Sequence, residues 1–99
     1  MQKQNRIDIR PSPIAGSWYP ANADELRRVL GGYLENAEPP TISGKIRGFV
    51  LPHAGLVYSG LTAAYALKAI AGQRYDRVII ISPSHQAYRG QILTSAHEA

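Results

Sequence analysis

The sequence predicts an α/β fold that is part of a mainly parallel sheet with flanking helices. Two short apolar runs, residues 46–51 and 77–81, have the length and composition of strands. A Gly- and Ala-rich helical stretch over residues 60–72 separates them. A strand, a helix and a strand of this length form one βαβ unit with a right-handed crossover. The second run is apolar at every position over 78–81, which is typical of a parallel strand that is covered on both faces.

Another helix is expected before this unit, between Asn22 and Pro39. Asn22 is a favourable N-cap residue, and Glu25 three positions later completes a capping-box pattern. Pro39 and Pro40 end the helix, because proline has no backbone N–H to donate. Apolar residues fall at helical spacing and form one apolar stripe: Leu26, Val29, Leu30, Tyr33, Leu34 and Ala37.

The remaining local signals concern turns. Ser59 is a candidate N-cap for the helix between the strands, and Gly72 is a candidate C-terminal stop. The turn-rich segment over residues 15–20 contains the only tryptophan, Trp18, followed by Tyr19. Two large rings in one loop are better explained by packing of that loop onto the domain than by a ligand platform.

Composition excludes several classes of function. The chain has 99 residues, 44% hydrophobic residues, 18% charged residues and a net charge of +4, which is typical of one small globular domain. Its basic residues are scattered, so no nucleic-acid partner is expected. No apolar run is long enough for a membrane span, and residues 1–10 lack a signal-peptide core. The chain has no cysteine, which excludes thiolate ligands within it and favours a cytoplasmic location.

The predicted sheet lacks the further strands and helices that would complete it. Residues 92–93 are the start of a further strand, but the chain stops at Ala99 without a closing element. Two parallel strands and two helices do not make a stable doubly wound sheet. Residues 1–99 are therefore expected to be the N-terminal portion of a single larger domain. The missing surface would come from a C-terminal portion or from a homo-oligomer.

Two histidines stand directly behind the predicted strands. His53 follows the first run and its Pro52, and His85 follows the second run. Each histidine alone is adequately explained as a loop residue that hydrogen-bonds a backbone carbonyl. Together they leave the sheet at its carboxyl edge, where open α/β sheets hold ligands, so a metal or proton-transfer site is expected.

The residues do not supply a complete metal site. A catalytic metal takes about three protein ligands, but Asp76 lies at the wrong end of its strand, and His97 and Glu98 lie near the terminus. The loop over residues 52–60 also leads onto a helix N-terminus, which is a setting for phosphate or carboxylate binding. Nucleotide-binding glycine patterns and a serine-hydrolase elbow are absent.

The chain resembles the Memo-like proteins, whose prokaryotic members are also called AmmeMemoRadiSam system protein B. The resemblance rests on motifs in the family's order: Ala15-Gly16-Ser17-Trp18-Tyr19-Pro20, Pro52-His53-Ala54-Gly55, Tyr58-Ser59-Gly60 and Pro83-Ser84-His85. It implies a fold like that of the class III extradiol dioxygenases, a non-haem iron group. It also implies that His53 and His85 match two metal-site positions, which bind iron or copper with a cysteine from the C-terminal part. A further implied role is the binding of phosphotyrosine-containing segments.

This sequence departs from the family pattern at two positions and in length. Leu56 stands where the family has a tyrosine, and Gln86 stands where a second histidine is frequent. Both changes put the details of substrate or metal binding in doubt. Family members are considerably longer, and the cysteine-bearing part is absent here.

Three hypotheses follow. The first is the N-terminal part of a metal-binding redox or dioxygenase-like protein, inactive as a fragment, with His53 and His85 as iron or copper ligands. Trp18 and Tyr58 are the candidate substrate-binding residues, for a small molecule or an anionic peptide. The second is a non-catalytic binding module that holds a phosphorylated or other anionic ligand in the same crevice. The third is a structural fragment without activity of its own.

Overall fold

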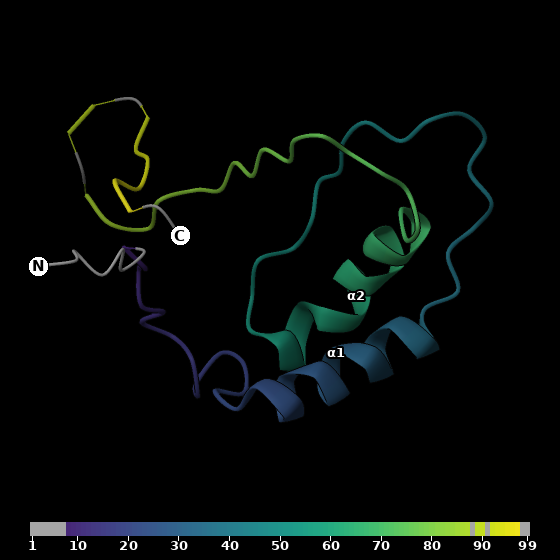
Figure 1. Ribbon diagram of the computed structural model, residues 1–99, viewed down its shortest axis with the longest axis horizontal. Helices are drawn as coiled ribbons and strands as arrows, with labels where there is room; N and C mark the ends of the chain where they lie inside the picture. Colours follow the sequence, from purple (N-terminus) through teal and green to yellow (C-terminus); the bar gives the residue numbers. More distant parts are fainter. Residues whose placement is uncertain (1–7, 88, 91, 98–99) are drawn as a thin grey trace, which may run out of the picture. The chain divides into compact units, whose positions relative to one another are not determined.

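The computed structural model describes residues 8–87, 89–90 and 92–97. The chain divides into two compact units. One combines residues 1–12 with residues 75–99, and the other is the continuous segment Pro13–Arg74. Two helices are formed, α1 over Ala23–Asn36 and α2 over Leu56–Ala69, and both belong to the second unit (Figure 1).

Helix α1 begins where its capping residue predicts. The side chain of Asn22 accepts a hydrogen bond from the backbone N–H of Glu25 at 3.0 Å, which satisfies one of the free donors of the first turn. Asp24 and Glu25 place negative charge near the positive end of the helix dipole. The helix ends at Asn36, and Ala37 is its C-cap, three residues before the second proline of the pair that excludes further helix.

Helix α2 differs from the prediction at both ends. It begins at Leu56 with Gly55 as the N-cap, so the candidate cap Ser59 lies inside the first turns. It ends at Ala69, and Gly72 lies beyond it with a φ of +80°, in the turn that Gln73 closes by donating to the Ile70 carbonyl. Gly72 therefore reverses the chain after the helix rather than ending the helix itself.

The two helices pack closely along one side (Figure 1). At one contact, a Cβ placed on Gly60 would lie only 2.6 Å from Cε2 of Tyr33, so the α2 backbone reaches the ring without an intervening side chain. Ala64 and Ala37 are buried. Near the other end, the Lys68 ammonium donates to the Ala37 carbonyl at 2.7 Å, which satisfies one carbonyl left free at the end of α1.

The predicted strands do not take part in a sheet in the described part of the chain. Within it, residues 46–51 and 77–81 are irregular, and the one bridge between backbone segments joins Ala15 and Tyr19. Residues 46–51 belong to the second unit and residues 77–81 to the first. The parallel sheet, its βαβ crossover and the further strand at residues 92–93 stay predictions.

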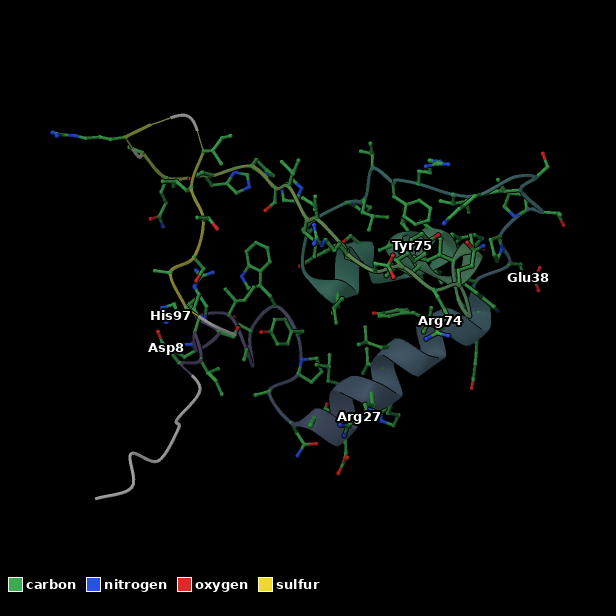
Figure 2. All side chains as sticks on the ribbon, turned by 45° about the horizontal axis from the view of Figure 1, so that its top comes forward. Asp8, Arg27, Glu38, Arg74, Tyr75 and His97 are labelled. Atoms are coloured by element: carbon green, nitrogen blue, oxygen red, sulfur yellow. The ribbon has the colours of Figure 1, made fainter. Side chains whose placement is uncertain are left out.

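The first unit is held by contacts between its two segments. Oδ1 of Asp8 lies 2.9 Å from Nδ1 of His97, and Figure 2 shows the two side chains next to each other. The apolar run over residues 78–81 is exposed, with accessible fractions from 76% to 92%. Across the ranges described, no helix is long and apolar enough to cross a membrane.

Candidate functional site

The loop that carries His53 leads directly into helix α2. His53 and Ala54 are exposed, Gly55 is half-buried and caps the helix, and Leu56 is its first residue. His53 therefore lies next to a helix N-terminus, as predicted from the sequence of residues 52–60. An exposed imidazole at the start of a fixed helix is accessible to a ligand from solvent.

The Trp18 loop is a tight turn with its own hydrogen bonds. The N–H groups of Ser17 and Trp18 both donate to the Ile14 carbonyl, at 3.1 and 3.0 Å, and the Ser17 hydroxyl donates to the same oxygen. Gly16 has a φ of +89°, a conformation that favours glycine, and its N–H donates to the Tyr19 carbonyl at 2.7 Å.

The Trp18 loop and the His53 loop are joined by the backbone. The carbonyl of Trp18 accepts a hydrogen bond from the N–H of Leu56 at 3.0 Å, so it satisfies one free donor at the N-terminus of α2. The same oxygen would lie 3.4 Å from a Cβ built on Gly55, so the two loops are in van der Waals contact there. The anchoring role predicted for this loop thus includes a backbone contact, while the Trp18 ring itself is 48% exposed.

Ser59 supports the His53 loop from inside the helix. Its hydroxyl donates to the Ala54 carbonyl at 2.9 Å, and Ser59 is one of the few buried residues in the described ranges. Sequence reasoning assigned Ser59 to the N-cap and missed this role. No local signal separates the two roles, because a serine near the start of a helix can cap it or hydrogen-bond to a nearby backbone carbonyl.

Trp18 and Tyr58, the candidate substrate-binding residues, both have atoms close to Gly55. A Cβ on Gly55 would be 3.4 Å from the Trp18 carbonyl and 3.8 Å from Cδ2 of Tyr58. Tyr58 is 87% exposed in the first turn of α2. The Tyr58 side chain and the Trp18 backbone therefore lie near the His53 loop, and the substrate-binding role of both residues stays a prediction.

His85 belongs to the other unit. It is exposed, next to a local turn in which the Ser84 hydroxyl contacts the backbone of Gln86. Because His53 and His85 lie in different units, their shared metal site stays a prediction. Among the residues with a described placement, no cluster of three or more His, Asp or Glu side chains is suited to a metal ion.

The structure describes one of the two alternative metal ligands near the C-terminus. His97 is exposed, and its Nδ1 lies 2.9 Å from Oδ1 of Asp8. Glu98 lies outside the described residues. In the same unit, a shallow cavity of about 430 Å³ is lined by Arg10, His97 and residues 93–96.

The chain is similar to known proteins over most of its length. The profile of the family described as "Memo-like protein" matches residues 10–99. "Protein memo-1 homolog" from Caenorhabditis elegans is 46% identical over 76 residues, 77% of this chain and 21% of the relative. "Protein MEMO1" from Danio rerio is 41% identical over 81 residues, 82% of this chain and 27% of the relative.

A fungal relative extends the match along the chain. "MEMO1 family protein MHO1" from Saccharomyces cerevisiae is 40% identical over 95 residues, 91% of this chain and 27% of the relative. The chain thus spans between a fifth and three tenths of the length of these relatives. No solved structure matches the chain.

Proposed function

The chain belongs to the Memo-like protein family, and from this membership we propose that it is the N-terminal part of a metal-binding redox protein. His53 and His85 are the proposed ligands, through neutral imidazole nitrogens. Imidazole is a suitable donor for both iron and copper. When bound, such an ion supplies one-electron or dioxygen chemistry that no side chain of this sequence supplies alone.

The observation that carries the proposal is the setting of His53. Its loop is exposed, yet its backbone is tied by Ser59 from inside α2 and by the Trp18 carbonyl at Leu56. A ligand-binding side chain needs this combination, because an accessible imidazole on a loosely held loop would lose entropy on coordination. The third ligand is proposed to come from outside these 99 residues.

The remaining site residues have proposed roles in binding. Trp18 and Tyr58 would flank a small substrate or an anionic peptide beside His53 through their exposed rings. The rival function, a metal-free anion module, would use the N–H groups at the start of α2. There the Leu56 N–H already donates to the Trp18 carbonyl, which leaves one donor fewer for an anion and favours the metal proposal.

Metal titration of the purified chain tests the proposal. We expect weak one-to-one binding of Cu(II), or of Fe(II) under anaerobic conditions, because two imidazoles leave the coordination shell short of protein ligands. His53→Ala and His85→Ala should each weaken binding by about tenfold or more. Oxygen consumption with a reductant should stay at the level of the free metal.

His97→Ala is the matched control, since it removes an exposed imidazole that pairs with Asp8. It should leave the affinity unchanged. Equal affinities in the wild type, His53→Ala and His85→Ala would contradict the proposal. Binding of a phosphopeptide without any metal requirement would instead support the anion module.

A further inference from the structure

Ser59 makes an unusual hydrogen bond for a serine within a helix. A helical serine commonly donates to the carbonyl four residues earlier, which here belongs to Gly55. That contact is long, at 3.5 Å, whereas the bond to Ala54 five residues earlier is 2.9 Å. The hydroxyl thus reaches past the helix and its cap to the residue that directly follows His53.

Burial increases the importance of this bond. Ser59 is 8% exposed and is the one polar side chain in the buried class within the described ranges. A buried hydroxyl without a partner is destabilising by about 1–3 kcal/mol, so the Ala54 carbonyl is held where the hydroxyl needs it. The next residue, Gly60, packs against the Tyr33 ring, which places Ser59 on the part of α2 that is fixed to α1.

The Ala54 peptide is followed by a second tether. The Leu56 N–H donates to the Trp18 carbonyl, so two consecutive peptide units after His53 each have one polar atom fixed by a neighbouring element. Fixing these units restricts the backbone torsions of Ala54 and Gly55. The backbone that directly follows His53 is therefore restrained by groups on α2 and on the Trp18 loop.

We propose that Ser59 is a positioning residue that orients the His53 loop for ligand binding. The hydroxyl acts only through the Ala54 carbonyl and does not itself contact the ligand. The inference rests on the proposed function for its purpose, but the order of the loop is a property of the metal-free chain. Ser59→Ala removes the tether, whereas Ser59→Thr keeps a hydroxyl that can make the same bond.

The test combines a metal-free and a metal-bound measurement on the whole chain. The backbone ¹⁵N order parameters of Ala54 and Gly55 should be about 0.85 in the wild type and should fall toward about 0.6 in Ser59→Ala. The Kd for Cu(II) should rise by about tenfold, which is the effect of removing a residue that supports a metal-binding side chain without touching the metal. Ser59→Thr should resemble the wild type in both, and helical circular dichroism should be equal in all variants.

Thr62→Ala is the matched control, because it removes an exposed hydroxyl from the same helix. It should change neither measurement. Unchanged order parameters in Ser59→Ala would overturn the inference, as would a Ser59→Thr variant that is as mobile as Ser59→Ala. A wild-type chain that binds no metal would refute the proposed function, while the order parameters would still decide the role of Ser59.

Discussion

Single residues decide how closely the two helices approach. Gly60 lets the backbone of α2 lie against the Tyr33 ring, where a Cβ would be 2.6 Å from Cε2 and 3.0 Å from Cδ2. The glycine is therefore explained by the lack of a side chain and not by a special backbone conformation, because it lies within regular helix. Gly31 and Gly32 in α1 differ, since no atom lies within 4 Å of a Cβ built on either.

Gly60→Ala should lower the stability of the helix pair. The added methyl group forces the Tyr33 ring to move, and overpacking of this kind is destabilising by about 1–3 kcal/mol. The better helix propensity of alanine offsets roughly 1 kcal/mol of that loss. Urea unfolding followed by circular dichroism at 222 nm should show a lower midpoint for this variant.

Gly31→Ala is the control that measures only the gain in helix propensity from glycine to alanine. It adds the same methyl group to α1 where space is open, so it should raise the midpoint. A Gly60→Ala midpoint that rises as much as that of Gly31→Ala would show that the Tyr33 contact does not limit the approach of the helices.

The helices show how far local sequence determines an element. Helix α1 was predicted correctly because its signals are local: Asn22 caps it, and the proline pair follows it. The start of α2 was placed too late, because the partner of the Leu56 N–H is the carbonyl of Trp18, which is distant in sequence. The motifs located His53, but nothing local indicates that Ser59 would bind the Ala54 carbonyl instead of capping the helix.

The predicted strands show a stronger limit on what local sequence can predict. The apolar pattern of residues 78–81 fits a buried parallel strand, but a strand exists only when another strand pairs with it. Register and partner are therefore non-local properties, and no periodicity in one run specifies them. The same limit applies to the predicted approach of His53 to His85, which depends on the predicted sheet and stays a prediction.

Helix α1 is tied to α2 at its C-terminus by one lysine. The Lys68 ammonium donates to the Ala37 carbonyl at 2.7 Å, and Ala37 is fully buried. Lys68→Met keeps an apolar stem of similar length but leaves this carbonyl without its charged donor. We expect a loss of about 1–2 kcal/mol in unfolding free energy, since a hydrogen bond from a charged group contributes about 1.5–3 kcal/mol.

Lys68→Arg separates charge from geometry, because it retains a cationic donor at the end of the side chain. It should recover most of the lost stability in the same urea titration. If Lys68→Met and the wild type unfold at the same urea concentration, the contact with Ala37 does not stabilise the helix pair.

At the scale of the whole molecule, the chain exposes apolar surface that a self-sufficient domain would bury. Each side chain of Val78-Ile79-Ile80-Ile81 is at least 76% exposed, and the hydrophobic residues in the buried class, in the ranges described, are two alanines. Such a run has unpaired backbone groups and high strand propensity, which favours association with other strands.

The isolated chain should therefore self-associate as its concentration rises. Replacing Ile79 and Ile81 by lysine should reduce the association, because two like charges oppose strand stacking and both side chains are exposed in the isolated chain. Sedimentation velocity over a concentration series measures the change, and Val57→Lys, at an exposed position of α2, is the charge control. If the wild-type chain is monomeric at all concentrations, the exposed run over residues 78–81 does not drive association.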